Sequence, residues 1–173
     1  MIQHEAAAPF PMPDDLPAAS RRVAAALAQA GHPALIRIFP DSTRSAAEAA
    51  AAVGCTPEAI VKSLIFRRAD DDVPVLALIG GADRVDTTRL ATAAGGRVAR
   101  ADADFVRRHT GFAIGGVPPV GHATPPVAVI DQGLFALDAV WAAAGTPHAV
   151  FQTTATDLAR IAGAITAAIA ADR

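Results

Sequence analysis

The sequence contains a single lysine, Lys62, among fifteen Lys and Arg residues, and it lies in the apolar run IVKSLIF at 60–66. This run predicts a strand. Because burial of an unpaired ammonium group is costly, Lys62 must reach a carboxylate, extend to solvent or line a pocket that receives an anionic ligand. A compact ammonium fits sites that a planar guanidinium does not. The alternative is chance drift in a composition that favours arginine.

A second feature is the Gly/Pro loop GGVPPVG at 115–121, which His122 follows directly. Its glycines permit close approach of the backbone, and its prolines fix φ and carry no N–H donor. Such a loop can present backbone amides to an oxyanion or a hydroxyl, although the same pattern also occurs in purely structural turns. His122 lies close enough in sequence to serve as a proton carrier, but the spacing does not require that role.

The usual catalytic and metal-binding motifs are absent from the sequence. There is no G-x-S-x-G elbow, no phosphate-binding P-loop and no H-E-x-x-H motif. The five histidines lack the spacing of metal ligands, and one cysteine cannot build a multi-cysteine site, so we expect neither a metal nor a cofactor. Cys55 stands between Gly54 and the Thr56-Pro57 cap, a position typical of packing, and is not expected to be a nucleophile.

The elements that position these residues follow from hydrophobic patterning. Alternation in the strand at 60–66 puts Lys62, Leu64 and Phe66 on one face and Ser63 on the other, and the polar turn at 70–72 predicts a hairpin with a strand at 73–79. Further strands are predicted at 34–39, 97–100, 127–131, 139–143 and 149–152, with helices at 14–30, after 43 to 53, at 86–94, at 102–109 and from 156. Helices and strands interleave without strict βαβ regularity, which predicts an α/β fold with a mixed sheet.

Composition restricts the class of protein. The sequence has 173 residues, 52% of them hydrophobic, and no apolar run approaches the roughly 20 residues of a membrane span. This predicts one soluble domain at 14–173 behind an N-terminal arm at 1–13, with no membrane partner. The arm lacks signal-peptide features, so a cytoplasmic location is expected. A net charge of −2 argues against DNA binding through a strong global field, while contact limited to an RNA end remains open.

Three segments together resemble the YbaK/prolyl-tRNA synthetase-associated domain family over about residues 34–170. They are IVKSL at 60–64, Val85-Asp86 at a helix start, and TGFAIGGVPPVGH at 110–122. Members are editing domains, inserted in bacterial prolyl-tRNA synthetases or free-standing, that hydrolyse the ester of mischarged aminoacyl-tRNA without a metal. The resemblance implies a single α/β domain with a strongly curved mixed sheet.

The resemblance also implies roles for individual residues. Lys62 corresponds to the family's essential lysine, which holds the terminal nucleotide or the substrate, and Gly115 opens the G-x-x-x-P loop that holds the 3′ end and positions the attack. These two residues are the predicted catalytic pair. The remaining predicted binding residues are Ser63, Leu64, Phe66, Gly116, Val117, Pro118, Pro119 and His122.

The chemistry is consistent with such a sparse site. An aminoacyl ester is already activated, so water or the vicinal ribose hydroxyl can attack it while the protein supplies orientation and oxyanion stabilisation. Leu64 and Phe66 would wall a pocket that selects small side chains by size. Two departures leave the edited amino acid open: Ala143-Ala144-Gly145 stands where cysteine-removing members have Ser-Gly-Gly, and Ser63 replaces the family's threonine.

The sequence therefore predicts a metal-independent aminoacyl-tRNA deacylase that edits in trans, acting on tRNA-Pro that carries a small residue such as Ala or Cys. The expected partners are the acceptor end of an aminoacyl-tRNA and, as a further candidate, an aminoacyl-tRNA synthetase. Two alternatives remain. One is a non-catalytic module of the same fold that binds a tRNA end or a synthetase, and the other is an unrelated small-molecule hydrolase using the same pocket.

Overall fold

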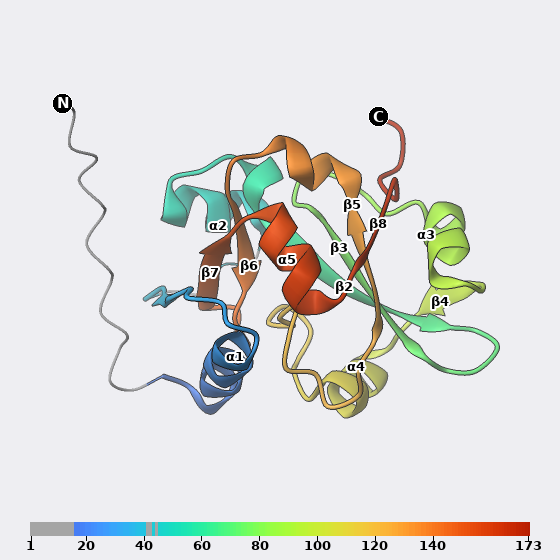
Figure 1. Cartoon of the computed structure of the whole chain (residues 1–173), viewed down its shortest axis with the longest axis horizontal. Helices are drawn as coiled ribbons and strands as arrows, with labels where there is room; N and C mark the ends of the chain where they lie inside the picture. The colour runs from blue at the N-terminus through green and yellow to red at the C-terminus, as the bar shows by residue number, and fades with distance from the viewer. Residues whose placement is uncertain (1–15, 41–42, 44) are drawn as a thin grey trace.

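The computed structural model describes residues 16–40, 43 and 45–173, and the predicted arm at 1–13 lies outside them. Five α-helices, two 3-10 helices and eight strands make up this part of the protein (Figure 1). None of the described helices is long and apolar enough to cross a membrane. In sequence order the elements are α1 (Ala18–Gln29), β1 (Ile36–Ile38), α2 (Ala46–Val53), η1 (Pro57–Ala59), β2 (Val61–Arg68), β3 (Pro74–Gly80), α3 (Thr87–Ala94), β4 (Val98–Arg100), α4 (Ala103–Thr110), β5 (Val127–Asp131), η2 (Gln132–Ala136), β6 (Val140–Ala143), β7 (Ala149–Thr153), α5 (Ala155–Ala162) and β8 (Ile165–Ala167).

The strands confirm the mixed α/β fold predicted from the sequence. Five of them form a sheet in the order β4-β2-β3-β5-β8, in which β2 and β3 are the predicted antiparallel hairpin while β3, β5 and β8 run parallel. The other three form an antiparallel sheet in the order β1-β7-β6. An isolated parallel bridge between Ile60 and Trp141 places the start of β2 beside β6 and so joins the two sheets.

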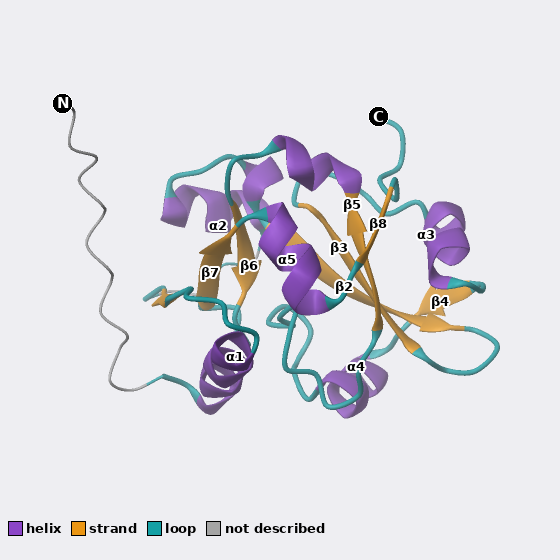
Figure 2. Ribbon diagram, viewed as in Figure 1, coloured by secondary structure: helices purple, strands orange, loops and turns teal. Residues whose placement is uncertain are grey.

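Helices cover the five-stranded sheet on both faces (Figure 2). The main core lies on one face and includes Leu27 of α1, Val106 of α4 and Leu158 of α5. A smaller core on the other face packs α3 against β3 and β5 through Leu90 and Val75 among others. Large side chains are completely buried in this arrangement, so the sheet is a rigid base for the segments that border it.

Local sequence explains where the helices begin and end. Asp86, Asp102 and Thr154 accept hydrogen bonds from the first turns of α3, α4 and α5, as their positions in the sequence predict. Of the three caps that the sequence predicts for α2, Asp41 and Ser42 lie outside the described residues and Thr43 does not cap the helix. The cap is Ser45, whose Oγ accepts from Glu48 N at 3.1 Å. Thr43 binds elsewhere, since both its N and its Oγ1 donate to Pro147 O, at 3.2 and 3.0 Å.

The C-terminal part differs from the sequence prediction. Helix α5 ends at Gly163, which adopts a left-handed conformation, and the following residues form β8 rather than loop or helix. The buried carboxylate of Asp131 holds the end of this segment, because its Oδ1 accepts from Ile169 N and Ala170 N at 2.8 and 3.0 Å. The alanine-rich sequence carries no strand signal, and only pairing with β5 reveals the strand.

Candidate active site

Lys62 extends from the face of β2 that alternation predicts. Leu64 and Phe66 join the smaller core under α3, whereas Val61 and Ile65 join the main core on the opposite face. Lys62 is half-buried, and its Nζ donates to the main-chain oxygen of Asp83. Because an ammonium group has three N–H donors, the others can serve a ligand.

The electrostatic surroundings make the Lys62 ammonium less stable than one in water. Burial is the largest cause and lowers the pKa of Lys62. The Asp83 carboxylate raises this pKa, and the nearby Arg84 guanidinium lowers it again. Asp83 is shared, since its Oδ1 is also 3.1 Å from Nη2 of Arg173. An anion placed beside Lys62 and Arg84 would therefore relieve an existing electrostatic cost.

Strand β2 changes neighbours immediately beyond Lys62. Along the edge opposite β3, β6 bridges to Ile60 and β4 pairs only from Phe66 onward. Within the described residues no strand pairs with this edge at 63–65. Arg68 N donates to Val73 O of the hairpin, and Ala69 N donates to Arg97 O on the β4 side.

In a strand the main-chain N–H and C=O groups of successive residues point to alternate edges. Ser63 and Ile65 are an even number of residues from Ala69, so their main-chain groups point to the same edge as those of Ala69, where no strand pairs with residues 63–65. The side chain of Ser63 adds a second polar group, because its Oγ is buried with no hydrogen-bond partner in the described structure. Unpaired strand edges bind extended ligands and other polypeptides through their N–H and C=O groups. The interval is therefore a place where a polar ligand can be held by the backbone.

The Gly/Pro loop combines an exposed tip with a buried base. Gly115 is exposed at φ +93°, a conformation that favours glycine. Gly116 is buried so tightly that a β-carbon there would stand 2.7 Å from Thr146 Cα and 2.8 Å from Gly145 O. Val117 packs in the main core, and Pro118 and Pro119 are also buried. Only the tip of the loop can therefore meet a ligand.

The turn at 145–147 lies between this loop and β6. A β-carbon on Gly115 would stand 3.8 Å from Pro147 Cγ, and Gly116 rests on the turn itself. The turn follows β6, and the isolated bridge between Trp141 and Ile60 places β6 beside the start of β2. Strand β6 therefore connects the two features, because one of its residues bridges to the start of β2 and the turn that follows it contacts the Gly/Pro loop.

The structure separates some of the predicted site residues. Leu64 and Phe66 share the face of Lys62, whereas Ser63 and the loop's Val117 belong to the opposite face of the sheet. The unpaired interval of β2 lies between these two sets. The close contact of Gly116 with the 145–147 turn was not predicted, because no local sequence signal links two glycines that lie so far apart in the sequence.

His122 is engaged with the loop rather than free. Its Nε2 lies 2.6 Å from Pro118 O, and its Nδ1 is buried without a partner in the described structure. Burial lowers the pKa of His122, although the hydrogen bond to Pro118 raises it. Since a carbonyl oxygen only accepts, a neutral His122 carries its proton on Nε2 and donates it to Pro118. This ring holds the base of the loop in place.

Substitution of His122 separates this holding role from proton transfer. His122→Gln keeps an amide donor near the position of Nε2, so single-turnover deacylation should stay within about fivefold of wild type, whereas His122→Ala should fall about tenfold. A glutamine cannot act as an acid or base at neutral pH. Equal collapse of both variants, with unchanged melting temperatures, would assign general acid/base catalysis to His122 instead.

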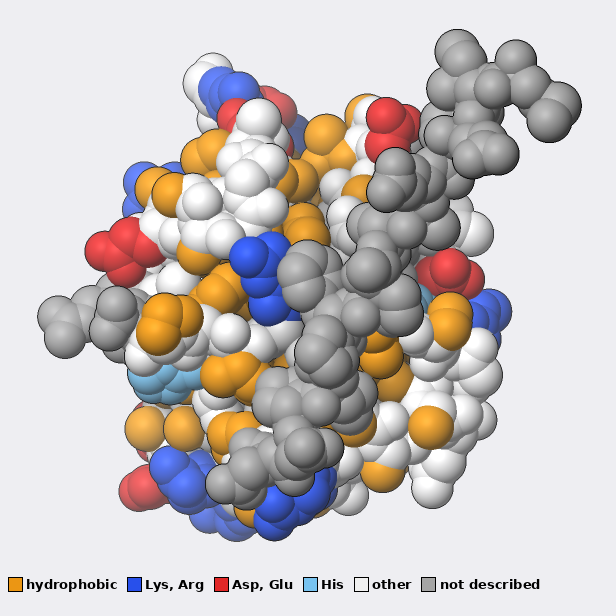
Figure 3. Space-filling model, turned by 90° about the vertical axis from the view of Figure 1, so that its left-hand side faces the viewer, with side chains coloured by type: hydrophobic (Ala, Val, Ile, Leu, Met, Phe, Trp, Pro, Cys, Tyr) orange, Lys and Arg blue, Asp and Glu red, His pale blue; other side chains and the backbone are white. Residues whose placement is uncertain are grey.

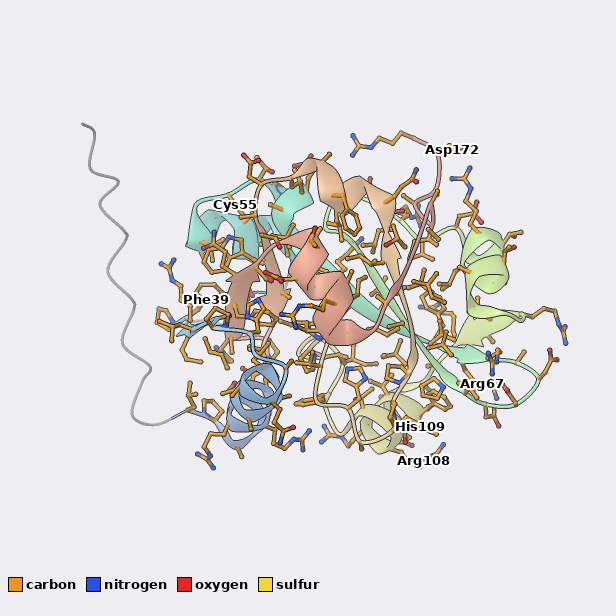
Figure 4. All side chains as sticks on the ribbon, viewed as in Figure 1. Phe39, Cys55, Arg67, Arg108, His109 and Asp172 are labelled. Atoms are coloured by element: carbon orange, nitrogen blue, oxygen red, sulfur yellow. The ribbon has the colours of Figure 1, made fainter. Side chains whose placement is uncertain are left out.

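Cys55 lies beside α2 (Figure 4). Its Sγ is 3.4 Å from Thr56 O, and burial raises the pKa of the thiol. A thiol of raised pKa contains little thiolate at neutral pH and is a poor nucleophile. Cys55→Ser is therefore expected to keep wild-type deacylation, measured after removal of reductant. Inactivation of a normally folded Cys55→Ser protein would restore the thiol hypothesis.

Two surface hollows lie outside this arrangement. One, of about 360 Å³, is lined by His32, Thr153 and Asp157 among others, and the second, of about 390 Å³, includes Arg67 and Arg108 (Figure 4). Neither lining contains a predicted site residue. In the part of the protein that the structure describes, no group of three His, Cys, Asp or Glu side chains could hold a metal ion.

The sequence and the fold were compared with those of known proteins. The sequence model of the aminoacyl-tRNA editing domain matches residues 40–161. The protein is similar to the crystal structure of a candidate trans-editing enzyme for prolyl tRNA synthetase, with 42% identity, a TM-score of 0.86, and coverage of 91% of this chain and 100% of that one. The hypothetical protein APE2540 is 29% identical with a TM-score of 0.80, covering 87% and 99%. Uncharacterized protein YwhH of Bacillus subtilis (strain 168) is 29% identical over 120 residues, which are 69% of this chain and 76% of YwhH.

Proposed function

Because the chain belongs to the aminoacyl-tRNA editing domain family, we propose that it hydrolyses misacylated tRNA in trans, with Ala or Cys on tRNA-Pro as its substrate. The observation that supports the proposal is the series of contacts that runs from the start of β2 through β6 to the 145–147 turn, on which the Gly/Pro loop packs. The similarity to a candidate prolyl-tRNA synthetase trans-editing enzyme supports the choice of tRNA.

The loop offers few backbone donors, which narrows the mechanism. Gly116 N already donates to Ala113 O at 3.1 Å, and Pro118 and Pro119 have no N–H. Val117 lies in the buried base of the loop, so Gly115, at the exposed tip, carries the amide that can orient the ribose hydroxyl and stabilise the oxyanion. Water, oriented by the vicinal ribose hydroxyl, attacks the ester carbonyl, and the oxyanion forms against this amide. The ester C–O bond then breaks, so that the amino acid leaves with the water oxygen in its carboxyl group and the ribose oxygen takes up the proton that the water loses.

Lys62 supplies charge rather than a nucleophile in this scheme. Its remaining N–H donors bind the phosphate or ribose of the terminal nucleotide and so fix the ester relative to the loop. Gly115 and Lys62 are thus the two residues in contact with the substrate near the scissile bond. Ser63 has a buried hydroxyl without a hydrogen-bond partner among the described residues, and we propose that it binds the aminoacyl group.

Selection by size depends on the residues that border Lys62. Leu64 lies two positions along the same face, and Ala143 is the last residue of β6, the strand that bridges to the start of β2. The half-buried Leu64 and Phe66 limit the room for the amino acid, whereas the methyl group of Ala143 leaves space. Such a pocket admits small side chains, and discrimination by one methylene is worth about 10-fold to 200-fold.

The substrate panel that tests this proposal consists of Ala-, Cys- and Pro-tRNA-Pro, Ala-tRNA-Ala and a simple alanine ester. We expect hydrolysis of Ala- or Cys-tRNA-Pro, with Pro-tRNA-Pro left intact. Binding of acylated tRNA without any hydrolysis would identify a non-catalytic module. Hydrolysis of the simple ester at the same rate as the tRNA substrates would identify a small-molecule hydrolase.

Metal dependence is a separate test. The proposed chemistry uses Lys62 and a backbone amide and no metal ion. After exhaustive dialysis of the protein against EDTA, and with protein and tRNA both assayed in metal-free buffer, deacylation should retain at least about 80% of its rate. Loss of the rate that zinc restores would contradict the proposed mechanism.

Recognition of the tRNA is expected to be local. With a net charge of −2, the protein cannot hold a whole tRNA through a strong overall field. We therefore propose contact with the acceptor end, with a synthetase as the partner that brings the two together.

A further inference from the structure

One face of α1 contacts both segments that frame the candidate site. The face consists of Ala19, Arg22 and Ala26, whose spacing of three and four residues aligns them on a helix. A β-carbon on Gly145 would stand 2.8 Å from both the carbonyl carbon and the carbonyl oxygen of Ala19. Ala26 Cβ would lie 3.4 Å from a β-carbon on Gly121. Helix α1 therefore supports the 145–147 turn and the end of the Gly/Pro loop.

Arg22 makes the most specific of these contacts. Its Nη2 donates to Gly111 O at 2.8 Å, and its guanidinium carbon lies 4.2 Å from the centre of the Phe112 ring. Gly111 ends α4 in a left-handed conformation, and Phe112 is buried at the point where the backbone turns toward the loop tip. A hydrogen bond from a charged donor and a stacked guanidinium together fix the start of the loop.

The contacts form a continuous series from α1 to the loop tip. Ala19 touches Gly145, Gly145 and Thr146 touch Gly116, and Gly116 precedes the rest of the buried loop base. At the other end of the loop, His122 holds Pro118, and its ring lies 6.2 Å from that of Phe112. Helix α1 is outside residues 40–161, the segment matched by the editing-domain model, so that match assigns it no role.

We propose that α1 is a positioning element of the candidate site and that Arg22 is a positioning residue for the Gly/Pro loop. The inference rests on the proposed deacylation for its kinetic consequence, but the placement of the loop is a property of the free protein. Arg22 acts through Gly111 and Phe112 and touches no substrate.

A direct RNA contact is the competing role for Arg22. The side chain is exposed, and Lys and Arg side chains gather along the lower edge of the face shown in Figure 3, at the height of α1 in Figure 1. A direct contact would act on KM and on its salt dependence. A positioning role would act on kcat and on the protection of loop amides, which separates the two.

The matched control is Arg21, the preceding residue of α1. Arg21 carries the same charge and is exposed, but its Nη1 donates to the main-chain oxygen of Leu16 at 2.6 Å, just before the start of α1. Arg21→Ala and Arg22→Ala therefore remove the same charge from the same helix. Only Arg22→Ala removes a contact with the loop.

The first measurement is amide hydrogen exchange of the two variants without tRNA. We expect Arg22→Ala to accelerate exchange at 112–117 by about tenfold while the amides of β3 keep their wild-type rates, and Arg21→Ala to change neither. Uniform acceleration across the whole protein would indicate global destabilisation and contradict a local role. Unchanged exchange at 112–117 would overturn the proposal whether or not the protein edits tRNA.

The second measurement is steady-state and single-turnover deacylation. Arg22→Ala is expected to lower kcat about tenfold with KM within about twofold of wild type, because misplacement of the loop affects the attack more than binding. A raised KM with a reduced salt dependence and an unchanged kcat would assign Arg22 to RNA binding instead. If wild-type protein deacylates none of the tRNA panel, the proposed function fails while the exchange result still decides the role of α1.

Discussion

Lys62→Ala is expected to lower single-turnover deacylation of the cognate tRNA by at least about 100-fold, since it removes the only cation proposed to contact the substrate near the ester. The unfolding free energy should change by less than about 1 kcal/mol, because Lys62 contributes one hydrogen bond and a costly burial of charge. Lys62→Arg should also be poor, as the guanidinium is larger and planar. The measurement is a rapid-quench assay, with urea unfolding in parallel.

The control for lost charge is Arg97→Ala. Arg97 is 81% exposed and pairs with Asp70 on the hairpin, so its removal lowers the net charge without touching the site. It should leave the rate within about twofold of wild type. Full activity of a folded Lys62→Ala protein would remove Lys62 from the mechanism, and equal losses in Lys62→Ala and Arg97→Ala would show an effect of overall charge alone.

The pH dependence adds a second readout for Lys62. Burial lowers its pKa below the usual 10.5, so the charged form is lost as pH rises through a lower range than for a lysine in water. The wild-type rate, corrected for spontaneous ester hydrolysis, should fall over that range. The residual rate of Lys62→Ala should not show this decline.

The second large effect is expected from Gly116→Ala. A β-carbon there meets the main chain of Gly145 and Thr146 at 2.7–2.9 Å, and main-chain atoms cannot rotate out of the way. The loop must therefore move away from the 145–147 turn, and a shift of about 1 Å in the position of the attack costs on the order of 100-fold in rate. The prediction is a loss of that size in kcat, measured with tRNA binding, which should weaken far less.

Two other glycines serve as comparisons for Gly116. Gly115→Ala places an alanine at φ +93°, but its β-carbon would lie 3.8 Å from Pro147 Cγ, which is an ordinary contact. The new methyl group therefore does not collide with the protein, and a loss of rate in this variant would indicate a collision with the substrate. Gly163→Ala introduces similar strain at φ +60° with nothing within 4 Å and no contact with the site. It should lower stability by about 1 kcal/mol and leave kcat unchanged. If Gly116→Ala behaved like Gly163→Ala, the loop would not depend on its contact with the turn.

The sequence predicted those parts of the site that local patterns determine. Alternation in β2 placed Lys62 on the correct face, and the hairpin across the Asp70–Asp72 turn and the caps at Asp86 and Asp102 are all confirmed. Each depends on residues close together in the sequence, where periodicity and side-chain capping act directly.

The features that were missed depend on residues far apart in sequence. Ser45 rather than Thr43 caps α2, and Thr43 instead donates to Pro147 O, which lies far away in the sequence. Strand β8 exists through its pairing with β5, and the contact of Gly116 with the 145–147 turn depends on the fold as a whole. Tertiary contacts of this kind override local propensity and leave no periodic signal in the sequence.

The contacts between Ala19, Gly145 and Gly116 are made largely by main-chain atoms, and this has a consequence for how the protein can change over evolution. Every amino acid except proline has the same main-chain atoms, so other substitutions at surrounding positions leave these contacts intact as long as the two glycines are kept. Ser63, Leu64 and Ala143, which border the proposed pocket, can therefore be exchanged one at a time without displacing the loop. The positions that must remain constant are thus different from those that border the proposed pocket, so under the proposed function a new substrate preference can arise in single mutational steps that leave the loop in place.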